Sequence, residues 1–150
     1  MPVEITLTIL AISVLLILSA LFSGSETALT AVSRARMHAL EQEGNERAWR
    51  VTKMLTQPER FIGTVLIGNN LVNILASALS TSLLISMFGE VGVVYATMIM
   101  TVLVVIFAEV LPKTYALAFP DRIAMAVAPI MQVLITALRP ATATIGFIVK

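Results

Sequence analysis

Three long apolar segments set the strongest limit on how this chain can fold. They are residues 5–22, 61–88 and 91–108. Because an α-helix rises about 1.5 Å per residue, each segment is long enough to cross a hydrocarbon core of about 30 Å or nearly so. Only 13% of the residues are charged, whereas soluble domains average about 25%. We therefore predict a single all-α membrane domain.

The charged residues between these segments predict the rest of the layout. The predicted membrane helices are residues 4–30, 61–88 and 91–116. Residues 34–60 hold six of the ten basic residues, and Gly44 followed by Asn45 predicts a turn between two amphipathic helices. Since positively charged loops stay in the cytoplasm, we expect this hairpin to be cytoplasmic and the N-terminus to lie outside.

The remaining tail, residues 121–150, is mostly apolar. Pro129 interrupts it and the apolar run is short, which favours juxtamembrane helices at the interface over a fourth crossing. At the other end, the acidic Glu4 stands where a cleavable signal peptide would be basic, so we expect the first segment to be retained. The sequence thus predicts a multi-pass protein of the cell (inner or plasma) membrane.

The third apolar segment ends on a carboxylate, Glu109. On insertion scales a charged side chain at the centre of a membrane helix costs roughly 2.5 to 3.5 kcal/mol. Pro112 has no N–H, so the carbonyl of Ala108 would lose its helical donor. A carboxylate beside a freed carbonyl is an arrangement that transporters use for cations. This segment alone equally favours the alternative, a carboxylate at the interface paired with Lys113.

The second segment contains an amide cluster. Asn69, Asn70 and Asn73 are spaced so that all three can face one side of a helix, and Ser77 and Ser80 continue that stripe. Such residues also form hydrogen bonds between membrane helices, which is the alternative. Three amides within five residues favour a ligand site.

In the first segment, Ser23, Gly24, Ser25 and Glu26 place a glycine between two hydroxyls. The same residues are also consistent with an N-cap for a short helix over residues 27–33. As a third polar insertion, the run adds to the candidate site.

The side chains of these clusters offer oxygen ligands only. Oxygen ligands suit Mg²⁺, Ca²⁺ or Na⁺, and the absence of cysteine disfavours Zn²⁺ and copper. The single histidine, His38, lies in the hairpin, away from the serines, so we expect no hydrolase and no enzyme. A net charge of +1 gives no reason to expect nucleic acid as a partner.

Three runs carry a resemblance to a known family. They are LFSGSETALTAVSRARMHAL, TVLIGNNLVNILAS and FAEVLPKTYAL. In this order they resemble the transmembrane domain of the CorC/CNNM (cyclin M) magnesium transporters. The resemblance implies a homodimer in the lipid membrane, with three membrane helices and a belt-like juxtamembrane helix (residues 121–138) in each subunit. It also implies Mg²⁺ transport, coupled to Na⁺ and directed outward.

The resemblance also implies which residues bind the ion. The implied metal ligands are Ser23, Ser25, Asn70, Asn73 and Glu109. The additional metal-binding or structural positions are Gly24, Glu26, Asn69, Ala108 and Pro112. Family members usually continue into regulatory CBS domains that bind nucleotide, and this sequence contains none. A non-transporting membrane anchor and a cation channel are the alternative functions.

Overall fold

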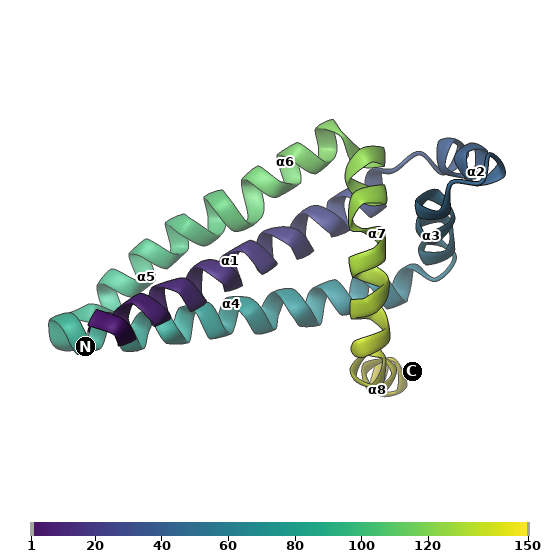
Figure 1. Cartoon of the computed structure of the whole chain (residues 1–150). Coiled ribbons are helices and arrows are strands. Elements are labelled where there is room, and N and C mark those ends of the chain that lie inside the picture. Colours follow the sequence, from purple (N-terminus) through teal and green to yellow (C-terminus); the bar gives the residue numbers. More distant parts are fainter. Residues whose placement is uncertain (1, 150) are drawn as a thin grey trace. The chain divides into compact units, whose positions relative to one another are not determined.

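The structure, a computed structural model, describes residues 2–149, and nearly all of them are helical (Figure 1). No strand occurs in that range, so the all-α prediction is confirmed. The elements are α1 (Pro2–Ala31), α2 (Arg34–Gln42), α3 (Glu46–Leu55), α4 (Pro58–Phe88), the 3-10 turn η1 (Gly89–Val91), α5 (Gly92–Leu103), the π-helix η2 (Val104–Val110), α6 (Leu111–Ala118), α7 (Pro120–Ala137) and α8 (Arg139–Val149). Lys150, the last residue of the expected juxtamembrane region, lies outside the described residues.

The chain divides into two compact units. Unit 1 holds the described residues up to 23 together with residues 68–112, and unit 2 holds residues 24–67 with the described residues from 113 onward. Because the boundaries cut through α1 and α4, each long helix contributes to both units.

Two helical stretches are long and apolar enough to cross a membrane: Pro2–Ala31 and Pro58–Ala118. The pair α7 and α8, bent by 65°, adds a third if it forms one span. In unit 1 the large side chains of Leu7, Ile17 and Met98 are at least 60% exposed. A continuous apolar surface of this kind would promote aggregation in water, whereas lipid tails solvate it.

Within unit 1, the second stretch reverses direction at Gly89. This residue has a φ of 73°, which glycine adopts without steric penalty. A Cβ on Gly92 would collide with the carbonyl oxygen of Leu84, so α5 begins in close contact with α4. The rings of Phe88 and Tyr95 meet edge to face with centroids 5.5 Å apart. The 61-residue stretch is therefore a pair of antiparallel helices.

In the same unit, α1 and α4 run in opposite directions (Figure 1). Ser19 of α1 forms a hydrogen bond with Asn69 of α4, and the ring of Phe22 covers Gly68. A side chain at Gly68 would displace that ring, so the glycine permits the close packing of the two helices.

Helix α1 continues without interruption through Gly24 to Ala31. The alternative interpretation of Ser23 and Ser25 as an N-cap region is therefore wrong, because both lie inside a continuous helix. The N-cap is instead Ser33, whose Oγ accepts a hydrogen bond from the backbone N–H of Arg36 at the start of α2.

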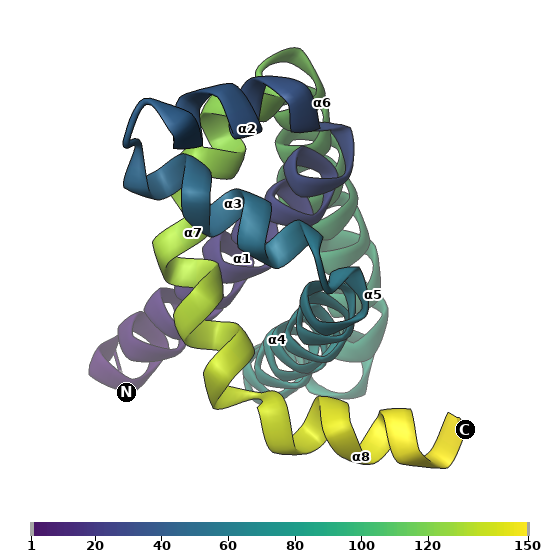
Figure 2. The ribbon, with the colours of Figure 1, turned by 90° about the vertical axis from the view of Figure 1, so that its right-hand side faces the viewer.

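In unit 2, the hairpin of α2 and α3 packs on α7 (Figure 2). Gly44 has a φ of 90° in the turn, and the Asn45 side chain caps α3 by accepting the N–H of Ala48 at 3.0 Å. The guanidinium of Arg50 donates to the Gln132 amide oxygen at 2.9 Å and joins α3 to α7. The predicted turn at Gly44 and Asn45 is confirmed.

Candidate cation site

A hydrogen-bonded trio lies at the centre of the polar residues of unit 1. Ser19 Oγ donates to Asn69 Oδ1 at 2.8 Å, and Asn73 Nδ2 donates to the same oxygen at 3.5 Å. Two donors occupy both lone pairs of the Asn69 oxygen. Asn69 therefore positions its neighbours in this arrangement and has no free oxygen for a cation.

Sequence reasoning missed Ser19, which is completely buried. The available signal was its spacing: Ser19 precedes Ser23 by four residues, so the two hydroxyls share one face of α1. A serine in an apolar helix more often bonds to its own backbone, as the exposed Ser13 does to the carbonyl of Ile9.

Two buried oxygens in unit 1 have no hydrogen-bond partner, Ser23 Oγ and Asn73 Oδ1. The orientation of the Asn73 amide is set by Asn69, whose accepting oxygen faces the Asn73 nitrogen. An unpaired buried polar atom costs about 1 to 3 kcal/mol, and nearly all such atoms in proteins are paired. A bound cation would satisfy either oxygen, because both have free lone pairs.

The antiparallel packing separates these two oxygens. Ser23 lies four residues beyond Ser19 along α1, and Asn73 lies four residues beyond Asn69 along α4. Since the helices run in opposite directions, the two residues lie on opposite sides of the Ser19–Asn69 bond, each by roughly 6 Å at about 1.5 Å per residue. The structure therefore does not bring Ser23 and Asn73 to one point.

Glu109 lies within the π-helical segment η2. Asn73 and Val104 line the same cavity, so they stand at a similar level of the α4–α5 pair. Glu109 follows Val104 by one π-helical turn. Because α4 and α5 are antiparallel, this turn leads from the height of Asn73 along the helix axis to that of Asn69. That level lies between the two unpartnered oxygens. The carboxylate is half-buried, and no group in residues 2–149 forms a hydrogen bond or ion pair with it.

The π-helix changes which carbonyl Pro112 affects. The N–H of Leu111 donates to the carbonyl of Ile106, five residues back. One residue further in this register, the carbonyl of Phe107 would need the N–H that Pro112 lacks. The expectation that Ala108 loses its donor assumed a regular α-helix, so the freed carbonyl shifts by one residue. Segments of π-helix are rare and frequently occur at functional sites.

A cavity of about 370 Å³ that contains several hydroxyl groups opens beside Asn73. Its hydroxyl-bearing lining residues are Ser77, Thr81, Thr97 and Thr101 of α4 and α5. The three threonines donate their protons to carbonyls of their own helices, which leaves their oxygen lone pairs available. The hydroxyl oxygens of this cavity therefore continue the row of oxygen-bearing side chains beyond Asn73, on the side away from Asn69.

The other predicted site residues have different surroundings. Asn70 is exposed and takes no part in the trio. Ser25, in unit 2, is fully buried, and its Oγ has no partner. Of the two residues that flank Ser25 in the sequence, Gly24 is buried and Glu26 is half-buried.

The donor set limits the chemistry of the site. Among residues 2–149 there is no group of three His, Cys, Asp or Glu side chains that could hold a metal ion. A site here must combine neutral oxygens with the single carboxylate of Glu109. Such donors suit a hard cation that is held weakly enough to be released.

These features define the class of protein as an all-helical membrane protein with oxygen-bearing side chains inside its apolar helices. The chain belongs to the cyclin M family: residues 10–150 match the family described as the cyclin M transmembrane N-terminal domain. The resemblance found in the sequence motifs is therefore confirmed.

Relatives from bacteria agree with this assignment. The chain is 50% identical over 107 residues to the UPF0053 inner membrane protein YfjD of Escherichia coli, which covers 71% of this chain and 25% of the relative. It is 40% identical over 108 residues to a UPF0053 protein of Haemophilus influenzae, covering 72% and 26% of the two chains. A protein of the same organism named polyamine export protein is 30% identical over 145 residues, covering 88% and 34%. The chain spans about a quarter of the length of the first two relatives.

Proposed function

We propose that this chain is the membrane domain of a transporter that exports Mg²⁺ in exchange for Na⁺. The observation that carries the proposal is the pair of unpartnered buried oxygens, Ser23 Oγ and Asn73 Oδ1, on either side of the level of Glu109. A protein that used these side chains only to hold helices together would pair them.

The distances favour an ion that keeps part of its water shell. Mg²⁺ prefers octahedral coordination at about 2.0 to 2.1 Å and gives up its waters reluctantly. An ion bound at either unpartnered oxygen would contact that oxygen directly, and water would complete the rest of its shell. The neutral oxygens beyond Asn73 also suit Na⁺, which needs less charge compensation than Mg²⁺. In this proposal, Ser23 and Asn73 are ligands at separate positions within unit 1, and Glu109, between their levels, supplies the charge.

Exposed Asn70 supports assembly as a homodimer. An amide on the outer surface of a membrane helix is unfavourable against lipid and is commonly buried against another helix. A second copy of the chain would cover it. We further propose that the N-terminus lies outside, that the α2–α3 hairpin is cytoplasmic, and that regulatory CBS domains follow this domain in the full-length protein.

Flux through proteoliposomes tests the proposal. Full-length protein should release Mg²⁺ along an imposed Na⁺ gradient, and Glu109→Ala should abolish this flux. Glu90→Ala is the matched control, because Glu90 is an exposed acid in the η1 turn of the same unit. Full Mg²⁺ flux in Glu109→Ala would contradict the proposal. Flux without any Na⁺ dependence would indicate a channel, and absence of flux in the wild type would indicate an anchor.

A second candidate cargo is an organic polycation. The relative named polyamine export protein aligns over 88% of this chain, and ammonium groups donate hydrogen bonds to the same hydroxyl, amide and carboxylate oxygens. Spermidine and Mg²⁺ should be compared in one counterflow assay. Spermidine transport that Mg²⁺ does not inhibit would favour the polyamine, whereas Mg²⁺ transport insensitive to spermidine would favour the metal.

A further inference from the structure

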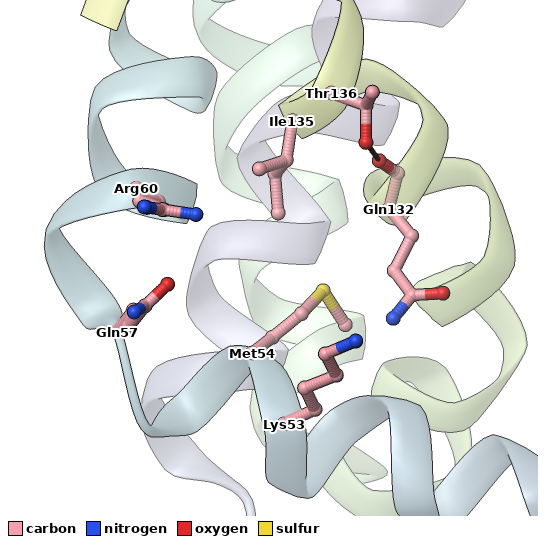
Figure 3. A pocket seen from close by; sticks show the side chains of 7 residues that line it. All are labelled: Lys53, Met54, Gln57, Arg60, Gln132, Ile135 and Thr136. Atoms are coloured by element: carbon pink, nitrogen blue, oxygen red, sulfur yellow. Dashed lines mark hydrogen bonds between the residues drawn. The ribbon is translucent and has the colours of Figure 1, made fainter. Parts of the chain in front are cut away.

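A basic pocket lies in unit 2 between the α3–α4 junction and α7 (Figure 3). Its volume is about 270 Å³. The lining residues are Lys53, Met54, Gln57, Arg60, Gln132, Ile135 and Thr136. Figure 3 shows Lys53 reaching toward Gln132, while Arg60 and Gln57 approach from the α4 side. The pocket has two positive charges and no acidic side chain in its lining.

Neither cation of this pocket has a carboxylate partner among residues 2–149. The ion pairs in the described part of the chain join Arg36 to Asp121, His38 to Glu41 and Arg50 to Glu46. Lys53 instead lies over the Trp49 ring, with Nζ 5.0 Å from the ring centroid. Two unpaired cations and two amide side chains around one pocket form a set of donors suited to an anion.

Arg60 also lines a second, larger cavity of about 690 Å³, the apolar groove. The apolar groove lies between α4 and α8, where the side chain of Thr142 approaches Gly63. Its remaining lining residues are Glu59, Leu66, Arg139, Ala143, Ile145, Gly146, Phe147 and Val149. Phe147 is 85% exposed, so the groove is open along α8. Around Arg60, the two cavities together have three basic residues and one acid.

We propose that the basic pocket and the apolar groove together bind one anionic phospholipid. Lys53, Arg60 and Arg139 bind the phosphate, and an acyl chain lies along the groove over Gly146. The basic pocket and the apolar groove meet at Arg60. A phospholipid bound there would place its phosphate against the basic residues and its acyl chain in the groove. Basic pockets beside membrane helices bind anionic headgroups in other proteins. This inference is independent of the ion that the domain transports.

Native mass spectrometry of the detergent-purified full-length protein tests the proposal. The three probes are phosphatidylglycerol, phosphatidylcholine with the same acyl chains, and glycerol phosphate. One phosphatidylglycerol per subunit should bind most tightly, because only this probe offers both the net negative charge and the chains. Equal binding of phosphatidylcholine would overturn the charge argument. Glycerol phosphate binding as tightly as phosphatidylglycerol would assign the basic pocket to a free phosphate compound and overturn the lipid.

Two variants separate the two halves of the site. Arg60→Gln should weaken phosphatidylglycerol binding about five-fold, the effect expected for one basic residue near a lipid headgroup. Arg47→Gln is the control with the same charge change, on the exposed face of α3 outside both cavities. Gly146→Leu should also weaken binding, because no atom lies within 4 Å of the Cβ position and the new side chain would enter the groove.

The variants also identify other occupants. Equal losses in Arg60→Gln and Arg47→Gln would show general surface attraction and overturn the site. A Gly146→Leu protein that binds lipid normally but changes its oligomeric state would assign the groove to a second copy of the chain. Normal lipid binding with an unchanged oligomeric state would also overturn the acyl-chain half of the proposal.

Discussion

In unit 1, the buried oxygens of Ser23 and Asn73 lack hydrogen-bond partners, whereas several polar side chains of unit 2 cap its helices or join them. Asp121 accepts hydrogen bonds from the Ser33 N–H at 2.9 Å and from Arg36, and Asn45 caps α3. The exception in unit 2 is Ser25, two residues beyond Ser23 in α1. Among the described residues, all three unpartnered buried side-chain oxygens therefore belong to candidate ligands.

The difference separates two uses of a polar side chain. In unit 2 a polar residue contributes to folding, because its removal leaves a backbone N–H or a cation without its partner. In unit 1 an unpaired oxygen lowers the stability of the empty protein, and a bound cation would offset that loss. Substitution of the unpartnered oxygens of unit 1 should therefore change transport, and substitution of the paired polar residues of unit 2 should change stability.

Among the substitutions that test this contrast between the units, Asn73→Leu should have the largest effect. Loss of the Oδ1 ligand should reduce Mg²⁺ flux by about ten-fold or more, the usual scale for a group that supports a metal site. The free energy of unfolding without Mg²⁺ should not fall, because the variant also removes an unpaired buried atom. Flux in proteoliposomes and thermal unfolding with and without Mg²⁺ measure the two effects. A less stable variant with normal flux would place Asn73 with the polar residues of unit 2.

Gly92→Ala tests the packing of unit 1 directly. A Cβ at this position meets the backbone carbonyl of Leu84, which cannot move without shifting α4 against α5. We expect a loss of about 1 to 3 kcal/mol in the free energy of unfolding, as for other overpacked sites. Gly146→Ala is the matched control, since its Cβ would meet open space. Equal stability of the two variants would show that the α4–α5 contact is loose.

In unit 2, Asp121→Ala should act on stability alone. It removes the acceptor for the Ser33 N–H and the ion-pair partner of Arg36, and we expect a loss of about 1 kcal/mol. The shift in melting temperature caused by Mg²⁺ should be the same as in the wild type. If the variant had the wild-type free energy of unfolding but its melting temperature no longer rose with Mg²⁺, the proposed contrast between the units would be wrong.

The smallest effect is expected for Ser19→Ala. Hydrogen bonds between membrane helices contribute about 0.6 kcal/mol on average, so the loss of the bond to Asn69 should change stability by about that amount. Ser19 holds Asn69, and Asn69 in turn holds the Asn73 amide. The Mg²⁺ concentration that gives half of the maximal shift in melting temperature should therefore rise. Ser13→Ala is the control, because Ser13 bonds only within α1. Identical Mg²⁺ responses of the two variants would show that the trio does not position Asn73.

Much of the fold follows from local features of the sequence. The apolar runs predicted the long helices, and Gly44 and Gly89 each lie at a turn with positive φ. The candidate site was less predictable, because helix spacing allowed all three asparagines to share a face. The packing of α1 against α4 selected Asn69 and Asn73 and left Asn70 exposed. The only sequence signal for Ser19 was its four-residue spacing from Ser23, and its hydrogen bond to Asn69 became visible only in the packed structure.

The sequence by itself determined the helical class, the family and the residue types available to a cation, because apolar periodicity and local motifs depend on near neighbours along the chain. Only the tertiary structure decided that Ser23 and Asn73 lie at different levels, since the antiparallel register of α1 and α4 sets that spacing. It also placed Glu109 in a π-helix, which shifts the carbonyl affected by Pro112 by one residue. Such a register depends on packing against other helices, which no single segment encodes.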